Sequence, residues 1–371
     1  MVRTNWLILS AVALFTVPLF TVLPLPAMEP EAVSTDYRSL VPQVLLPLLH
    51  APEVHQELKL SDSQIKQLEQ FFVKADGPWF RARILPAQEQ SEVIAKLETL
   101  THSWLTQHAS AQQQQRLQEL EYQAQSVRSL LRTDVATAID LTDEQQQQLA
   151  QLAQESDAAQ KKLSAARTSG EAAEDLESTA TQAIKSEQNA LVKILKPEQL
   201  QAFTKLVGEL FDTENLKRIY PMAPEFVAVE HWLNSPPLTM QALRGQVVLV
   251  HFYAFECHNC HANFDVYQRW HKELTDQGVV VVGIQTPETA HERDPEAVKS
   301  AAQQRELEFP ILIDIESKNW KAYGNTMWPT VYVIDKQGYI RHWWQGELRW
   351  KGTAGDQTIE AIVQHLLKEE S

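Results

Sequence analysis

The sequence GQVVLVHFYAFECHNCH, residues 245–261, decides how the C-terminal part of this chain folds. An apolar run of strand-forming residues leads directly into Cys257 and Cys260, the only two cysteines of the chain. A helix that begins at Cys257 would aim backbone N–H groups and the positive end of its dipole at the sulfur. The pattern therefore predicts a strand that ends at an easily ionised, reactive cysteine.

The letters CHNCH at 257–261 also spell the haem-attachment motif C-x-x-C-H. In that alternative His261 would be the proximal iron ligand and Met327 the distal one, and the strand-to-helix turn would have to open around the ring. A zinc site would use both cysteines with His258 and His261, although four ligands within five residues cannot easily surround a tetrahedral ion. The motif alone leaves these chemistries open; the strand before it and Trp328-Pro329 after it favour redox exchange, and we expect neither a metal nor a cofactor.

Length and charge limit the other possibilities. The chain has 371 residues, a mass of 42.3 kDa and a formal net charge of -15. This length favours two or three domains. The acidic balance, without any cluster of Lys or Arg, argues against a nucleic-acid partner.

The N-terminal sequence predicts export. An uncharged apolar run from Trp6 to Met28 follows Arg3. Residues 1–28 are therefore expected to be a signal peptide, with Ala27 as a small residue for cleavage, or a membrane anchor. Either version places the protein body outside the cytoplasm, in a periplasm-like compartment, secreted or tethered by this segment alone. Because the chain has only two cysteines, it has no structural disulfide framework, and the pair is a redox site or a ligand pair.

Residues 36–215 are expected to form a helical, Gln-rich domain, because apolar residues recur there at three-to-four spacing. One phrase recurs in it, at 60–64 (LSDSQ), 141–145 (LTDEQ), 195–199 (LKPEQ) and, more loosely, 110–113 (SAQQ). The phrase resembles the LTxxQ motif of periplasmic helical chaperones of the Spy type. It is explained more simply by capping boxes at four helix starts. We expect this region to be a spacer, a dimerising arm or a docking module for a partner.

Prolines around Tyr220–Pro224 mark the predicted start of a second domain, residues 222–371, in which strands alternate with helices. Strands are expected at 225–229, 247–253, 279–284, 311–314, 330–334 and 339–344, and helices at 257–275, 295–306, 319–323 and 357–368. The run Val279–Val282 has no polar alternation, so its strand should be covered on both faces. The sequence therefore predicts an α/β domain, a central sheet flanked by helices, preceded by a mostly α-helical domain.

Residues 224–368 resemble the thioredoxin superfamily, and within it the TlpA-like and DipZ-type redoxin domains. The resemblance rests on motifs that follow in order: LRGQVVLV (243–250), CHNC (257–260), GIQTPE (283–288), Trp320–Asn325, WPT (328–330), YVID (332–335), GYIR (338–341) and Gly346-Glu347. It implies a mixed central sheet and thiol–disulfide exchange with protein thiols or disulfides and with a partner reductase or oxidase.

The resemblance also implies roles for single residues. Cys257 would be the nucleophile, and Cys260 would resolve the mixed disulfide by closing the Cys257–Cys260 bond. Pro329 matches the family's cis-proline, and the backbone of Trp328 would pair with an extended substrate segment. An alternative is a helical scaffold whose thioredoxin fold has become a docking platform with little turnover.

Four positions depart from the family pattern. His251 stands where the family has a buried Asp or Asn, and Ala254 stands where peroxiredoxins place a threonine. Glu256 replaces a tryptophan and is expected to disfavour the Cys257 thiolate, whereas a protonated His258 would stabilise it. These two effects oppose each other, so the sequence leaves the redox direction open.

Overall fold

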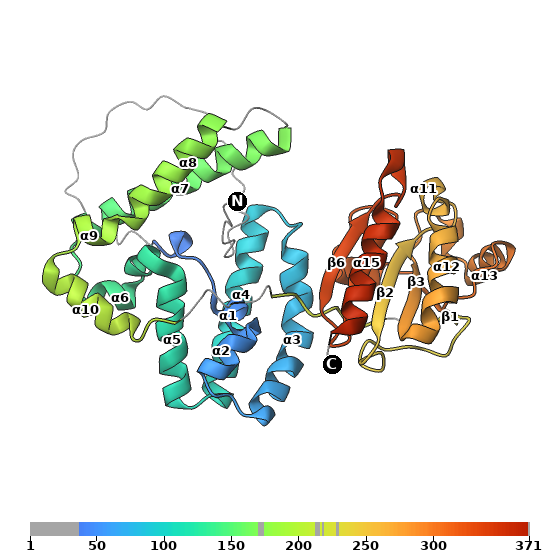
Figure 1. The fold of residues 1–371 in the computed structure, drawn as a ribbon, viewed down its shortest axis with the longest axis horizontal. Coiled ribbons are helices and arrows are strands. Elements are labelled where there is room, and N and C mark those ends of the chain that lie inside the picture. Colours follow the sequence, from blue (N-terminus) through green and yellow to red (C-terminus); the bar gives the residue numbers. More distant parts are fainter. Residues whose placement is uncertain (1–36, 170–173, 212–215, 217–218, 228–229, 370–371) are drawn as a thin grey trace, which may run out of the picture. The chain divides into compact units, whose positions relative to one another are not determined.

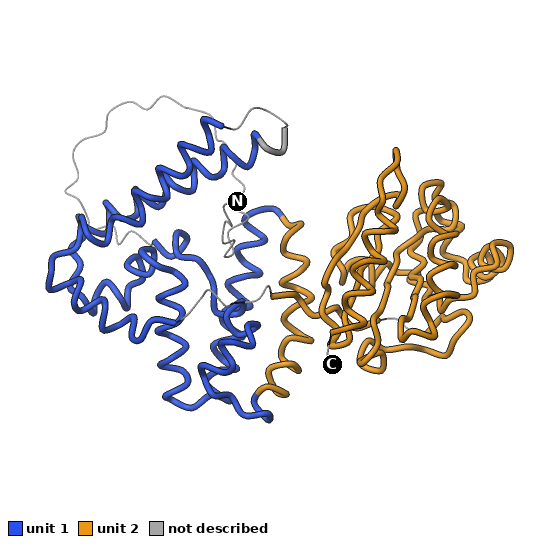
Figure 2. Tube along the Cα trace, in the orientation of Figure 1, with its two compact units in different colours: residues 1–64, 86–218 blue, residues 65–85, 219–371 orange. Residues whose placement is uncertain are grey.

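The structure, a computed structural model, describes residues 37–169, 174–211, 216, 219–227 and 230–369. It divides into two compact units, residues 1–64 with 86–218 and residues 65–85 with 219–371 (Figure 2). Residues 65–85, which the sequence places in the helical region, thus group with the C-terminal part.

The predicted signal peptide or anchor at 1–28 lies outside the described residues. None of the helices that are described is both long and apolar enough to span a bilayer.

The described part of the first unit is helical (Figure 1). Its α-helices are α1 (Leu45–His50), α2 (Pro52–Glu57), α4 (Ala87–His108), α5 (Ala111–Gln125), α6 (Thr133–Ala138), α7 (Asp143–Ser169), α8 (Glu174–Gln188), α9 (Ala190–Ile194) and α10 (Pro197–Val207). Two short 3-10 helices, η1 (Arg38–Leu40) and η2 (Ser126–Leu131), complete it. An apolar core that includes Leu130, Val135, Leu149 and Phe203 joins η2, α6, α7 and α10. The expected helical region is therefore confirmed.

Three of the recurring phrases are capping boxes, the fourth has only the bond from Lys196 N–H to Gln199 Oε1, and the four glutamines also bind one another in pairs. At two helix starts, Ser61 N–H donates to Gln64 Oε1 (2.9 Å) and Ser110 N–H donates to Gln113 Oε1 (2.9 Å). The Nε2 group of Gln64 then donates to Gln113 Oε1 at 2.9 Å, and Gln113 Nε2 donates to the carbonyl of Leu58 at 3.1 Å. We call Gln64 and Gln113 the first glutamine dyad.

The other two phrases form a second glutamine dyad of the same kind, Gln145 and Gln199. Their side-chain amides face each other, with Gln145 Nε2 2.8 Å from Gln199 Oε1. Gln145 Nε2 also donates to the Ile194 carbonyl and Gln199 Nε2 to the Asp140 carbonyl, both at 2.8 Å. Each dyad thus links the start of one helix to the chain just before the start of another.

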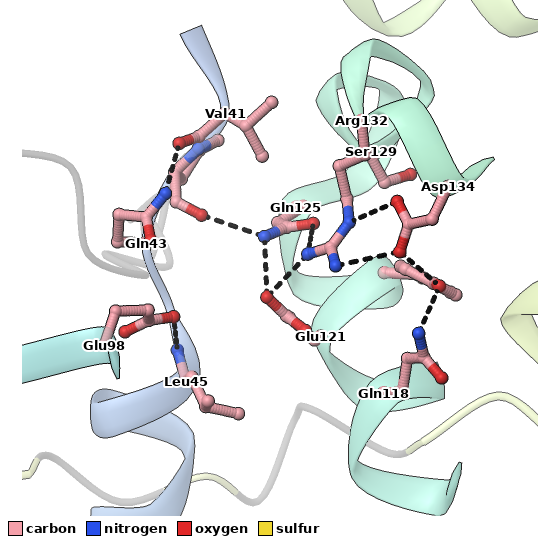
Figure 3. Close-up of polar contacts among 12 residues, drawn as sticks. Val41, Gln43, Leu45, Glu98, Gln118, Glu121, Gln125, Ser129, Arg132 and Asp134 are labelled. Atoms are coloured by element: carbon pink, nitrogen blue, oxygen red, sulfur yellow. Dashed lines mark hydrogen bonds and ion pairs between the residues drawn. The ribbon is translucent and has the colours of Figure 1, made fainter. Parts of the chain in front are cut away.

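A polar network lies inside the first unit, between α4, α5 and the start of α1 (Figure 3). Arg132 Nη1 lies 2.7 Å from Glu121 Oε1, and Gln125 Nε2 donates to the same carboxylate at 3.2 Å. Glu98 accepts the N–H of Leu45 at 3.3 Å and is itself buried. Burial, reinforced by the nearby Glu121 charge, raises the pKa of Glu98 to about 7.

The second unit contains a six-stranded mixed sheet in the order β1-β4-β3-β2-β5-β6. Its strands are β1 (Trp232–Leu233), β2 (Val247–Tyr253), β3 (Val279–Gln285), β4 (Ile311–Ile313), β5 (Thr330–Ile334) and β6 (Ile340–Gln345). The central strands β2, β3 and β4 run parallel, whereas β1, β5 and β6 pair antiparallel to their neighbours. This is the predicted central mixed sheet.

Helices cover both faces of the sheet. All residues of β2 are buried, so its alternate side chains enter two different cores. Val247 and Leu249 pack into a core with α12 (Phe264–Leu274) and α15 (Gly355–Lys368). Val248 and Val250 pack into the opposite core, which contains α14 (Lys318–Ala322) at its edge. The continuously apolar strands follow from this double burial.

Part of α3 (Asp62–Ala82) completes the second unit. Phe80 belongs to the same core as β5 and meets Tyr332 and Trp343 edge-on, at 6.1 and 5.6 Å between ring centroids. The buried carboxylate of Asp76 accepts the N–H of Met222 at 2.7 Å. The sheet is therefore packed partly by a segment that is distant in sequence.

Two expected elements differ in the structure. Residues 225–227 of the expected strand 225–229 are not a strand, and residues 228–229 lie outside the described part; the edge strand is β1 instead, at Trp232–Leu233. The expected helix 257–275 is interrupted, because α11 (His258–His261) ends before Asn263 and α12 begins at Phe264. The buried Asn263 side chain accepts the N–H of Leu348 at 2.9 Å, and its Nδ2 donates to Gly346. The break therefore provides contacts to the chain that follows β6.

Candidate active site

The two cysteines lie at the C-terminal end of β2 and have different surroundings. Cys257 is partly exposed and precedes α11, whereas Cys260 lies inside that helix and is fully buried. Both are free thiols in this structure. Of the pair, Cys257 is thus the thiol that another molecule can reach.

Hydrogen bonding gives the two thiols different pKa values. The hydrogen bond from the Cys260 thiol lowers the pKa of Cys257 to about 7, helped by the backbone N–H groups of Cys260 and Asn259 and opposed by burial and by Glu288. The same hydrogen bond, together with burial, raises the pKa of Cys260. Cys257 is therefore the thiolate of the pair and Cys260 the proton-bearing thiol.

The peptide bond between Trp328 and Pro329 is cis, as expected. Trp328 stacks on Trp320 with ring centroids 4.0 Å apart, and it packs on the same apolar core as Cys257. The Pro329 carbonyl accepts the N–H of Gly346 at 2.8 Å. The Gly346 carbonyl also accepts a hydrogen bond from Asn263 Nδ2. Gly346 therefore connects the cis-proline to the residue just before α12.

A groove of about 310 Å³ begins beside the cysteine pair. Its lining residues are Asn259, Trp344, Gln345, Gly346, Glu347, Trp350 and Thr353. Asn259 lies between the cysteines, and Trp350 at the far side is 55% exposed. The groove therefore contains one residue of the CHNC motif together with an exposed aromatic ring.

Comparison with known proteins finds relatives of the C-terminal part of the chain. Residues 221–343 match the AhpC/TSA family. Protein DipZ of Mycobacterium bovis is 35% identical over 151 residues, which are 40% of this chain and 21% of DipZ. The thiol-disulfide oxidoreductase YkuV of Bacillus subtilis is 28% identical over 154 residues, which are 42% of this chain and 99% of YkuV.

The C-terminal part of this chain is a thioredoxin-like redoxin domain. Among solved structures, a thiol-disulfide isomerase from Corynebacterium glutamicum is 25% identical, covers 40% of this chain and 98% of its own, and has a TM-score of 0.35. The region that matches DipZ is about a fifth of the length of DipZ. The boundaries of this redoxin domain, residues 222 and 371, stay a prediction.

In the redoxin domain, Glu256 and His258 both have exposed side chains. The Glu256 carboxylate accepts hydrogen bonds from His291 Nδ1 at 2.8 Å and Thr289 Oγ1 at 2.7 Å, and the His291 bond is the main cause of the lowered pKa of Glu256. The His258 ring lies 6.5 Å from that of His261, centroid to centroid. A tuning role for either residue stays a prediction.

Glu288 was not among the sequence candidates, although its carboxylate acts on both thiols. Its charge raises the pKa of Cys257 and that of Cys260. Glu288 follows β3 in the sequence TPE, and β3 is the parallel neighbour of β2. The carboxyl ends of parallel neighbours meet at one edge of a sheet, and that rule could have identified the residue.

The haem alternative requires a free nitrogen on His261. His261 Nε2 donates to the Phe255 carbonyl at 2.7 Å, and Arg305 Nη2 lies 2.9 Å from Nε2 and 3.2 Å from Nδ1. Both ring nitrogens are therefore engaged. For zinc, the described residues bring together no group of three His, Cys, Asp or Glu side chains that could hold an ion.

His251 lies beneath the site and is completely buried. Its ring stacks on Tyr267 at 3.9 Å between centroids and meets Phe309 edge-on at 4.8 Å. Neither ring nitrogen has a hydrogen-bond partner among the described residues, and burial lowers the pKa of His251 to about 3. His251 is consequently a neutral aromatic residue of the core at neutral pH.

Proposed function

We propose that this protein is a thiol–disulfide oxidoreductase that acts on protein partners through Cys257 and Cys260. One observation carries the proposal: a partly exposed thiol with a pKa of about 7 is hydrogen-bonded by a buried second thiol, at the end of a redoxin strand. The similarity to YkuV supports the proposal, because YkuV is named a thiol-disulfide oxidoreductase.

In the proposed reaction, the Cys257 thiolate attacks one sulfur of a substrate disulfide. A Cys257–substrate disulfide forms, the substrate S–S bond breaks, and the second substrate sulfur leaves as a thiolate that takes up a proton. Cys260 then loses its proton and attacks Cys257 Sγ. The Cys257–Cys260 disulfide forms, the first substrate sulfur is released, and the substrate has gained two electrons.

Trp328, Pro329 and the groove beside Asn259 would receive the substrate segment that carries the reacting cysteine. The cis-proline edge of a thioredoxin-like fold would receive an extended chain, and the groove lined by Asn259 and Trp350 would offer further contacts. A partner reductase or oxidase would reset the cysteine pair. Partners are therefore expected to be proteins and not nucleic acid.

The apolar segment at 1–28 supports export, as a cleaved signal or as a tether, to a compartment where disulfides persist. The helical region 36–215 would then act as a spacer, a dimerising arm or a docking module. Fractionation of cells that express the full chain tests the location. Recovery of the protein in the cytoplasm would contradict it.

Insulin reduction by the full chain in the presence of dithiothreitol tests the activity. The wild type should accelerate precipitation of the insulin B chain, and Cys257→Ser should not. Equal rates for the two proteins would overturn the oxidoreductase proposal and favour a docking scaffold.

Mixed-disulfide trapping tests the roles of the two cysteines. Cys260→Ala should accumulate covalent complexes, because nothing resolves the Cys257–substrate bond, whereas Cys257→Ala should form none. Equal trapping by both variants would show that the nucleophile is wrongly assigned.

A further inference from the structure

Glu292 is a completely buried carboxylate near the cysteines that the proposed reaction does not use. It lies in the short 3-10 helix η4 (His291–Arg293) after β3. Glu292 Oε1 accepts the backbone N–H of Glu256 at 2.7 Å. Glu292 Oε2 accepts the backbone N–H groups of Glu288 at 2.7 Å and Thr289 at 2.9 Å.

These three bonds explain how a carboxylate can be buried here. An unpaired buried charge is costly, but short N–H bonds to a carboxylate are among the stronger hydrogen bonds in proteins. Glu256 directly precedes Cys257, whereas Glu288 and Thr289 belong to an exposed loop. Glu292 therefore joins the backbone just before Cys257 to the loop of Glu288 and Thr289.

We propose that Glu292 is a positioning residue: by binding these three amides it fixes the loop that carries the Glu288 carboxylate to the backbone just before Cys257. Glu288 itself is exposed, and no rigid element carries it. Without the bonds to Glu292, its loop would be free to move away from the cysteines.

Two other charged or titratable groups near the pair have partners of their own. Glu256 is bound to His291, and His261 is bound to Phe255 and Arg305. His258 points to solvent. The charge of Glu288 raises the pKa of both Cys257 and Cys260.

The chemical consequence rests on the proposed thiol–disulfide exchange. A negative charge beside Cys257 disfavours the thiolate, but it has no comparable effect on the neutral disulfide. Glu288 therefore shifts the pair toward the disulfide and makes the dithiol a better reductant. Glu292 would set the redox balance through Glu288 without touching either sulfur.

The first test is thiolate absorbance at 240 nm during a pH titration of the full chain. Glu288→Gln removes the charge but keeps the backbone N–H, and it should lower the pKa of Cys257 by roughly 0.5 to 1 unit. Its equilibrium with glutathione should then move roughly threefold toward the dithiol at pH 7. Glu296→Gln, an exposed control on α13 (Pro295–Gln304), should change neither value.

A double-mutant cycle tests the positioning role. Glu292→Gln should shift the pKa of Cys257 in the same direction as Glu288→Gln, and the double variant should shift it no further than Glu288→Gln alone. Additive shifts would overturn the proposal, because Glu292 would then act on the thiol independently. An unchanged pKa in folded Glu292→Gln would overturn it too.

Glu292→Asp is the second variant if Glu292→Gln does not fold, since it keeps the charge but shortens the reach. It should reproduce the shift in the pKa of Cys257 that Glu288→Gln causes.

Amide hydrogen exchange of the wild type tests the bonds without any variant. Slow exchange of the Glu288 and Thr289 N–H groups supports the bonds to Glu292, and fast exchange overturns them. Failure of insulin reduction by the wild type would instead count against the proposed function alone, because the titration needs no turnover.

Discussion

At the scale of single residues, burial would raise the pKa of Cys257, yet three hydrogen bonds lower it to about 7. The donors are the Cys260 thiol and two backbone N–H groups of the helix start. Because Cys260 gives its proton to this bond, its own ionisation is disfavoured. The proposed order of reaction, Cys257 first and Cys260 second, rests on Cys257 being the sulfur that accepts this hydrogen bond.

Alkylation by iodoacetamide should therefore report the pKa of Cys257. The rate constant should rise roughly thirtyfold between pH 5.5 and pH 8, with half its maximum near pH 7, because only the thiolate reacts. Cys257→Ser, which leaves the buried Cys260, should react far more slowly. A midpoint at or above pH 8.5 would contradict the hydrogen-bond pattern.

The sequence was informative about residues only where a local motif carries the chemistry. The CHNC pair and the cis-proline at 329 could be predicted because their neighbours in sequence are also their neighbours in space. Glu288 and Glu292 act through a loop from another strand, and Glu256, which lies next to Cys257 in sequence, directs its carboxylate to His291 instead. The distance in sequence from Cys257 therefore did not indicate which carboxylates influence the thiols.

At the scale of elements, continuous apolar runs predicted β2, β3 and β5 almost to the residue. The edge strand β1 was missed because two residues paired on one side leave no periodic pattern. Capping phrases predicted the helix starts, but they contain nothing that indicates which starts meet. The pairing of the glutamine dyads depends on tertiary packing.

The first glutamine dyad should contribute measurable stability. Gln113→Ala removes the acceptor for Ser110 and the donor to Leu58, so the free energy of unfolding should fall by about 1 to 2 kcal/mol. Gln64→Ala should cost a similar amount, and the double variant less than the sum, because the two share one bond. Urea unfolding measures all three.

The matched control is Gln112→Ala, an exposed neighbour on α5. It should change the free energy of unfolding by less than about 0.5 kcal/mol. Additive losses at Gln64 and Gln113 would contradict the reciprocal bond between them.

At the scale of the whole molecule, lowering the pH acts oppositely on the two units. His251, with a folded pKa of about 3 against an ordinary 6.5, takes up its proton only on unfolding, so acid destabilises the second unit. Glu98, with a folded pKa of about 7 against 4.5, takes up its proton first in the folded state, so acid stabilises the first unit and this gain is lost as pH rises through 7.

Between pH 7.5 and 5.5 each effect should amount to about 1 to 2 kcal/mol. Urea unfolding at both pH values should show that His251→Phe weakens the acid-dependent loss and that Glu98→Gln removes the acid-dependent gain. If both variants keep the pH dependence of the wild type, these two groups are not its source.

Phe80 should matter for the redoxin sheet although it lies far from it in sequence. Phe80→Ala removes a buried ring that touches Tyr332 and Trp343, at a cost of about 3 kcal/mol in the free energy of unfolding. Tryptophan fluorescence during urea unfolding follows the transition. Val73→Ala on the exposed side of the same helix should cost less than about 0.5 kcal/mol, and equal losses would contradict the packing role.

The placement of residues 65–85 in the second unit also orders events during synthesis. Phe80 and Asp76 leave the ribosome long before Met222 and Tyr332, the residues against which they pack. Until then an aromatic ring and a carboxylate have none of these contacts. The nascent helical half must therefore carry an unfinished surface, and the emerging sheet has to find it before its own folding is complete.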